Sequence, residues 1–206
     1  MTLSPTPAKP VIEWGWAGRA LIEPSGDLHV VVEFDGGAVV ALLDGLGHGF
    51  EAAEAVRAAV PSIEAHAREP VLDLVLQCHT ALRKTRGAVM TVASFSSLDS
   101  SMTWTGVGNV DGILVRARDA PEARNEAISV RGGVVGFRLP PLRADRLAVS
   151  RGDTLVMATD GIHSAFVEGV AIRFSPQELA ESILARYAKG TDDAHVLVAR
   201  YLGASP

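Results

Sequence analysis

Most of the chain is a series of short apolar runs separated by glycine, proline and acidic residues. Several runs are nearly continuous in Val, Ile, Leu and Ala, which is typical of strands covered on both faces. Asp35-Gly36 between the first two runs favours a tight antiparallel hairpin, because glycine tolerates the positive φ of such a turn. We expect strands at residues 28–34, 37–43, 89–96, 102–106, 110–116, 145–149, 154–159 and 194–201.

Three stretches have helical patterns. Residues 50–60 are rich in alanine and glutamate, and we expect Pro61 to end this helix. Residues 70–84 repeat apolar side chains at i, i+3 and i+4, which indicates one buried helical face. The Ser-Pro-Gln-Glu sequence at 175–178 is a capping box with proline in the first turn, and it predicts a third helix that ends near Gly190.

The order of these elements predicts an α+β fold. Strands too apolar to face water on either side must pack sheet on sheet, and helices then shield the outer faces. We therefore expect a four-layer α/β/β/α sandwich of two antiparallel sheets flanked by helices. Residues 11–203 are expected to form this single domain after a flexible leader at 1–10, with surface loops over 117–144 and a short strand near 127–130.

The composition is that of a one-domain globular protein, with 206 residues of which 48% are hydrophobic and 21% charged. A formal net charge of -5 without a basic block argues against nucleic-acid binding. No apolar stretch approaches the roughly 20 residues that cross a bilayer, and the N-terminus lacks a signal-peptide core, so we expect a cytoplasmic protein without membrane contact. No heptad pattern indicates an obligate dimer, and we expect a monomer. The single cysteine, Cys78, is interpreted as a buried, inert thiol.

Aspartates stand where apolar strands begin or end. They are Asp27, Asp44 followed by Gly45, Asp160 followed by Gly161, and the pair Asp192 and Asp193. Crowded carboxylates repel one another and lose hydration, and a divalent cation cancels both penalties. Mg²⁺ and Mn²⁺ prefer such oxygen ligands, and two ions would activate a water for in-line displacement at phosphorus. Isolated Asp-Gly pairs are usually turns, so spacing alone leaves a shared metal site and ordinary turns as equal alternatives.

The ordered set of motifs resembles the metal-dependent PPM (PP2C-type) protein serine/threonine phosphatases. The matching elements are Gly26-Asp27, Asp44-Gly45 with Gly47-His48-Gly49, Gly108-Asn109, Asp160-Gly161 and Asp192-Asp193. The chain is most similar to the small bacterial SpoIIE-like branch, and its short length is similar to the stressosome phosphatases of that branch. This resemblance implies removal of phosphate from phosphoserine and phosphothreonine of stressosome proteins with STAS domains, which resets the signalling complex by feedback.

The resemblance also implies roles for the matching residues. Asp44 bridges two Mn²⁺ or Mg²⁺ ions, and the carbonyl of the glycine after it binds one of them. Asp160 and Asp192 complete the ligand set, with Asp193 as the alternative to Asp192. Asp27 ligates directly or through water. The reaction needs no covalent phosphoenzyme, so the single cysteine has no part in it.

Two positions depart from the family pattern. Many members have a histidine directly after Asp-Gly as the proton donor to the leaving group, whereas here Leu46 follows and His48 is the candidate donor. Many have a phosphate-binding arginine where this chain has Ile22, and Arg19, Arg86 or a metal-bound water are the open alternatives. These departures keep a non-catalytic PPM-fold binding module as a competing function. A phosphatase of a phosphorylated anti-sigma-factor antagonist is a third.

The remaining histidines and tryptophans are given structural roles. His163 is expected to be an exposed residue at a helix start, because a lone histidine is seldom a ligand. His195 is interpreted either as an orienting partner of a carboxylate or as a buried strand histidine. His29 is expected to be structural or exposed, and Trp14 and Trp16 are expected to be packing residues.

Overall fold

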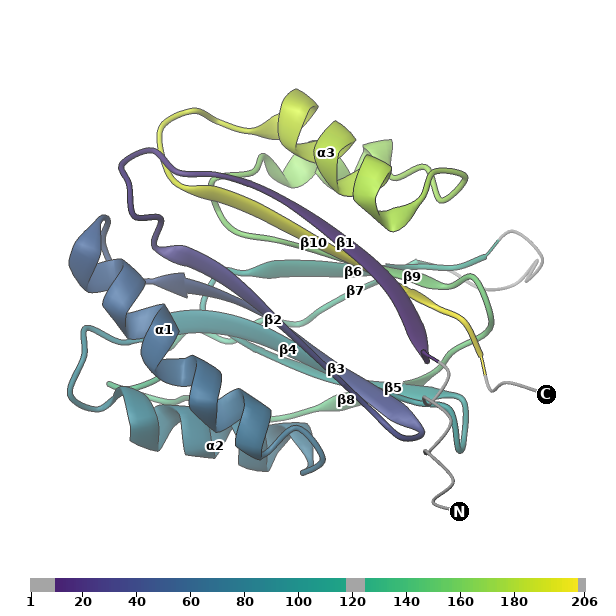
Figure 1. The fold of residues 1–206 in the computed structure, drawn as a ribbon, viewed down its shortest axis with the longest axis horizontal. Helices are drawn as coiled ribbons and strands as arrows, with labels where there is room; N and C mark the ends of the chain where they lie inside the picture. The colour runs from purple at the N-terminus through teal and green to yellow at the C-terminus, as the bar shows by residue number, and fades with distance from the viewer. Residues whose placement is uncertain (1–9, 118–124, 204–206) are drawn as a thin grey trace, which may run out of the picture.

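The computed structural model describes residues 10–117 and 125–203, which form two five-stranded antiparallel sheets packed face to face (Figure 1). Sheet I has the order β1 (Ile12–Arg19), β10 (Ala194–Tyr201), β9 (Thr154–Ala158), β6 (Asp111–Val115), β7 (Glu126–Ala127). Sheet II has the order β2 (Asp27–Phe34), β3 (Gly37–Gly45), β4 (Ala88–Ser96), β5 (Ser101–Val107), β8 (Asp145–Ala148).

Helices cover the outer face of each sheet, so the predicted α/β/β/α sandwich is confirmed (Figure 1). Two helices, α1 (Phe50–Ala65) and α2 (Val71–Leu82), pack on sheet II. A third helix, α3 (Pro176–Tyr187), packs on sheet I beside a 3₁₀ helix at Ser164–Gly169. Among the described residues, no helix has the length and apolar character needed to span a membrane.

The central strand β3 explains why the predicted strands are continuous apolar runs. Val40 and Leu42 point into the core between the two sheets. Val39 and Leu43 point the other way, into the core beneath α1 and α2. Because both faces of the strand are buried, alternation with polar residues would place unsatisfied groups in one of the two cores.

Local signals in the sequence set two of the connections. Phe34 pairs with Gly37 across the β2–β3 turn, where Gly36 has a φ of 77°. At the start of α3, the Ser175 hydroxyl accepts the N–H of Glu178, and the Glu178 carboxylate accepts the N–H of Ser175 at 2.9 Å. The predicted hairpin and capping box are therefore confirmed.

The prediction that Pro61 ends the first helix is wrong, because α1 continues to Ala65. Proline removes one backbone hydrogen bond from a helix interior. The turn that follows is nevertheless held by Ile63, which is fully buried against sheet II together with Ala59. Burial of these two side chains outweighs the local cost, while Pro61 itself faces solvent.

The structure adds one strand that the hydrophobic pattern did not predict. This is β1, an edge strand that pairs only with β10 among the described residues. The strand expected near 127–130 is the two-residue β7, shifted toward the N-terminus. His163 precedes the 3₁₀ helix and is exposed, as expected. Most of the predicted leader at 1–10 lies outside the described residues.

Candidate metal centre

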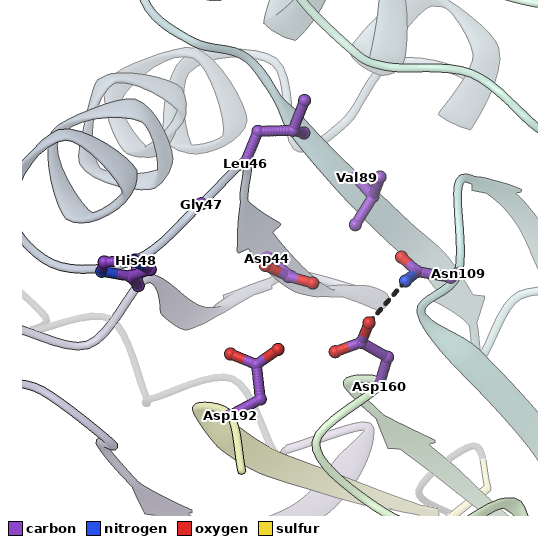
Figure 2. A pocket seen from close by; sticks show the side chains of 8 residues that line it. All are labelled: Asp44, Leu46, Gly47, His48, Val89, Asn109, Asp160 and Asp192. Carbon is purple, nitrogen blue, oxygen red and sulfur yellow. Dashed lines mark hydrogen bonds between the residues drawn. The ribbon is translucent and has the colours of Figure 1, made fainter.

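Strand ends from both sheets meet at one cavity of about 260 Å³. Asp44 lies near the end of β3, Asp160 follows β9, and Asp192 precedes β10. Their three carboxylates converge across this cavity (Figure 2). The remaining lining residues are Leu46, Gly47, His48, Val89 and Asn109.

The glycine after each of two aspartates is required by close packing. A side chain on Gly45 would collide with the backbone of Ala52 in α1. A side chain on Gly161 would collide with the backbone carbonyl of Asp193. Glycine at these two positions therefore lets the backbone of α1 approach the residue after Asp44, and the backbone of Asp193 approach the residue after Asp160.

Asp27 lies beside Asp44, because the two residues are paired across the β2–β3 hairpin. It is only 6% exposed and borders a neighbouring cavity rather than the one lined by the three converging carboxylates. The hydroxyl of Thr159 donates a hydrogen bond to Oδ2 of Asp27 at 2.7 Å. Asp27 is thus held at the edge of the carboxylate group through one of its oxygens.

The two adjacent aspartates before β10 face different surroundings. Asp192 lines the cavity. The carboxylate of Asp193 accepts the backbone N–H groups of Leu21 at 2.7 Å and Gly26 at 2.6 Å. Asp193 is therefore directed toward the loop between β1 and β2.

The electrostatics of the site favour a bound cation. Burial, and then the neighbouring carboxylates, raises the pKa of Asp44 to about 8. Burial is also the main reason why the pKa of Asp27 is raised to about 7. Within 10–117 and 125–203, no lysine or arginine forms an ion pair with Asp44, Asp160 or Asp192. The nearby ammonium of Lys189 instead donates to the backbone carbonyl of Asp160, so none of these three carboxylates is paired with a cation in the described part of the chain.

The donor set suits hard divalent cations that keep part of their water shell. In the described part of the chain, no group of three or more His, Cys, Asp or Glu side chains lies close enough together to hold a metal ion through side chains alone. Mg²⁺ commonly binds through one or two carboxylates and retains several waters, so an open arrangement of acids fits it. Nδ2 of Asn109 donates to Oδ2 of Asp160 at 2.8 Å, which orients that carboxylate (Figure 2).

The candidate proton donor, His48, and the two candidate phosphate-binding arginines differ in their distance from the carboxylate cavity. His48 is exposed and lines the same cavity as the three acids. Arg86 pairs with Glu51 of α1 and lies against Gly47 at the cavity wall. Arg19 lines the neighbouring cavity instead. Of the two arginines considered from the sequence, only Arg86 contacts the wall of the carboxylate cavity.

The neighbouring cavity has a volume of about 370 Å³ and an aromatic wall. His29 and His195 share a hydrogen bond of 2.9 Å between Nδ1 and Nε2, and Trp16 stacks on His195. Burial, together with His29, lowers the pKa of His195 to about 3, so this ring is neutral at physiological pH. His195 is therefore a buried strand histidine, the second of its two interpretations.

A family model described as Stage II sporulation protein E (SpoIIE) matches residues 35–202. The chain belongs to the SpoIIE family. Among curated relatives of this family member, "Phosphoserine phosphatase RsbX" of Bacillus subtilis (strain 168) is 25% identical over 138 residues, which is 67% of each chain. The predicted membership in the SpoIIE-like branch of PPM-type serine/threonine phosphatases is thereby confirmed.

Solved structures agree with this SpoIIE-family assignment. A chain from work on the bacterial stressosome, a modular system adapted to control secondary messenger signalling, has a TM-score of 0.82 at 28% identity and covers 92% of this chain and 99% of its own. RsbX in complex with magnesium has a TM-score of 0.80 at 21% identity, covering 92% and 95%. The PP2C phosphatase domain of SpoIIE from Bacillus subtilis, solved with a fragment of its regulatory domain, has a TM-score of 0.72 at 20% identity, covering 94% of this chain and 64% of that longer chain. The fold is that of metal-dependent PPM phosphatases.

Sequence reasoning did not single out Thr159 as part of the site. This residue directly precedes Asp160 at the end of an apolar strand and is 2% exposed. A buried hydroxyl needs a hydrogen-bond partner, so a polar residue next to an acid at a core strand end was the available signal. Its partner, Asp27, is 132 positions away along the chain, which no local pattern reveals.

Proposed function

We propose that this SpoIIE-family protein removes phosphate from phosphoserine and phosphothreonine of stressosome proteins with STAS domains, and so returns the signalling complex to its resting state. The observation that carries the proposal is the convergence of Asp44, Asp160 and Asp192 in one cavity, where no described lysine or arginine forms an ion pair with their carboxylates. Similarity to RsbX and to a chain from stressosome work supports the choice of substrate.

The acids of the cavity would hold two Mn²⁺ or Mg²⁺ ions. Asp44 is assigned as the ligand shared by both ions because it pairs with Asp27 across the hairpin and also shares the cavity with Asp160 and Asp192 of sheet I. Asp160 and Asp192 are assigned as further ligands, with the carbonyl of Gly45. When bound, the ions would activate a water for in-line attack on phosphorus and offset the charge of the phosphoryl oxygens.

His48 is assigned as the donor of a proton to the leaving serine or threonine oxygen. It lies in the loop between β3 and α1, so its ring is accessible from solvent and borders the cavity. Leu46, which stands directly after Asp-Gly, has no group that transfers a proton. The candidate donor is therefore supplied two residues further along the same loop.

Arg86 is assigned as the cation that binds the substrate phosphate. Its guanidinium lies against Gly47 at the cavity wall, and a planar guanidinium suits bidentate contact with phosphate oxygens. Ile22, at the position where many family members have arginine, is 51% exposed and has no charge. Arg86 would thus replace the missing arginine from another element.

The surroundings of the cavity suit a protein substrate rather than a small metabolite. Two large apolar side chains lie exposed beside it: Leu46, which lines the cavity, and Phe50, which begins α1 just after the loop that carries His48. Clusters of exposed apolar side chains mark surfaces that contact other macromolecules. A phosphorylated residue entering the cavity would bring the surface of its own protein against these side chains.

The test is a phosphate-release assay with the full chain and a purified, phosphorylated STAS-domain protein. Hydrolysis is expected with Mn²⁺ or Mg²⁺ and is expected to stop with EDTA. A phosphorylated anti-sigma-factor antagonist serves as the competing substrate, and faster turnover of it would redirect the assignment within the same chemistry. Metal binding without turnover of either phosphoprotein would instead identify a non-catalytic binding module.

A further inference from the structure

The carboxylates of the site come from two different sheets. Asp27 and Asp44 belong to sheet II, whereas Asp160 and Asp192 flank strands of sheet I. The sheets meet through an apolar core, and apolar contacts are not directional. A metal site shared between the sheets needs directional contacts that fix the distance between its two halves.

Thr159 supplies one such contact. The backbone N–H of His195 donates to Oγ1 of Thr159 at 2.9 Å, so the hydroxyl oxygen already accepts a hydrogen bond. Its single proton is directed to Oδ2 of Asp27 at 2.7 Å, because the other acceptor within reach, the carbonyl oxygen of His195, is more distant at 3.4 Å. Thr159 thus ties β10 and the end of β9 in sheet I to the first residue of β2 in sheet II.

Asp193 supplies a second contact. Its two carboxylate oxygens accept the N–H groups of Leu21, near the start of the connection from β1 to β2, and Gly26, at its end. Gly26 directly precedes Asp27, so this bond fixes the backbone that carries Asp27. Asp193 is 4% exposed, and charge-assisted hydrogen bonds of this kind are short and strong.

We propose that Thr159 and Asp193 are positioning residues that clamp the two sheets together at the site and so set the spacing of carboxylates from opposite sheets. The inference rests on the proposed function, because that function gives the spacing its importance. Neither residue is assigned as a metal ligand. Asp192 and Asp193, adjacent in the chain, would then have separate tasks, ligation and clamping.

Calorimetric titration of the metal-free full chain with Mn²⁺ tests the role of Thr159. Thr159→Val keeps the shape of the side chain but removes the hydroxyl, and it is expected to weaken Mn²⁺ binding by about tenfold or more. Thr159→Ser restores the hydroxyl and is the matched control, with affinity expected near that of the wild type. Folded Thr159→Val protein that binds Mn²⁺ as tightly as the wild type would overturn this part of the clamp.

Amide hydrogen exchange of the metal-free protein tests the role of Asp193. Asp193→Asn replaces one accepting oxygen by an NH₂ group, so the amides of Leu21 and Gly26 are expected to exchange about tenfold faster or more. Asp192→Asn is the matched control, and it is expected to leave those amides unchanged while it removes metal binding. Unchanged exchange in Asp193→Asn would refute the clamp, as would a loss of Mn²⁺ binding equal to that of Asp192→Asn.

The two measurements separate the clamp from the proposed function. A wild-type chain that neither binds Mn²⁺ nor hydrolyses phosphoprotein would end the proposed function, whereas the exchange measurement would still decide whether Asp193 holds the loop. A wild-type chain that binds and hydrolyses, beside variants with unchanged affinity and unchanged exchange, would refute the clamp alone.

Discussion

The side-chain amide of Asn109 donates a hydrogen bond to Asp160, from Nδ2 to Oδ2 at 2.8 Å. Asn109 precedes β6 and Asp160 follows β9, so two neighbouring strands of sheet I cooperate in orienting one carboxylate. Loss of a hydrogen-bond partner that orients a metal ligand typically lowers metal affinity or activity by about 10-fold to 100-fold. The pair offers a direct test of whether Asp160 must be oriented to act.

Replacing Asn109 is therefore expected to slow phosphate release. Asn109→Ala removes the donor and is expected to reduce the rate by about tenfold to a hundredfold. Asn109→Asp adds a like charge beside Asp160 and is expected to be more damaging, because both oxygens then repel the acid. Steady-state assays across a Mn²⁺ titration measure both effects, and equal rates for wild type and Asn109→Ala would show that the bond is dispensable.

Asp44→Asn is expected to abolish turnover and to stabilise the metal-free protein. Because the pKa of Asp44 is raised to about 8, folding at neutral pH requires this carboxyl to take up a proton, a cost that asparagine does not have. Relief of about 1 kcal/mol would raise the melting temperature by about 2–4 °C. The same variant should lose the stabilisation that Mn²⁺ gives the wild type. Thermal denaturation with and without Mn²⁺ measures both. A metal-induced shift that survives in Asp44→Asn contradicts the assignment of this ligand.

Arg86→Ala is expected to raise KM for the phosphoprotein by about tenfold with a smaller change in kcat, because the guanidinium contributes to binding of the phosphate. Arg19→Ala is the matched control, since Arg19 lines the neighbouring cavity and its loss should leave KM unchanged. Initial-rate measurements over a range of substrate concentrations distinguish the two. A larger effect from Arg19 would transfer the phosphate-binding role to that residue.

Cys78 is expected to be unreactive in the folded protein. Burial raises the pKa of its thiol to about 11, so very little thiolate forms at pH 8. Labelling with a chromogenic disulfide should be slow in buffer and complete after addition of denaturant. Cys78→Ser is expected to retain phosphatase activity, and its inactivation without loss of fold would contradict a mechanism that does not use the thiol.

The hydrophobic pattern predicted most of the fold because both faces of the central strands are buried, so nearly every residue in them has to be apolar. It missed β1 because neither face of that edge strand is lined by a run of aliphatic side chains. Trp14 and Trp16 are 38% and 42% exposed, whereas Gly15 lies close against the backbone of α3. Gly15 and Ala17 are small because α3 packs closely on their face, whereas both tryptophans lie on the other face and contact His29 of sheet II. This mixture of small and aromatic residues gives no apolar run to detect. Helix α1 was predicted too short, because the rule that proline ends a helix takes no account of the burial of Ile63 in the next turn.

At the site, sequence motifs indicated which acids to consider but not which direction each side chain takes. The difference between Asp192 and Asp193 depends on Leu21 and Gly26, which lie 172 and 167 positions from Asp193. The same holds for Thr159, whose partner begins a strand of the other sheet. These contacts depend on how the two sheets pack, so the local sequence of either segment cannot predict them.

The close backbone packing at Gly45 and Gly161 distinguishes residues that the fold requires from residues that only the chemistry requires. Each glycine is needed by the architecture whether or not catalysis survives, since any larger residue would push α1 or the start of β10 outward. Asp44, by contrast, is costly to the fold, because burial and neighbouring carboxylates raise its pKa to about 8, and its carboxyl is needed only for the chemistry of the site. A homologue that lost phosphatase activity would therefore keep the glycines but not the aspartates. The aspartates, and not the glycines, would distinguish an active homologue from an inactive one.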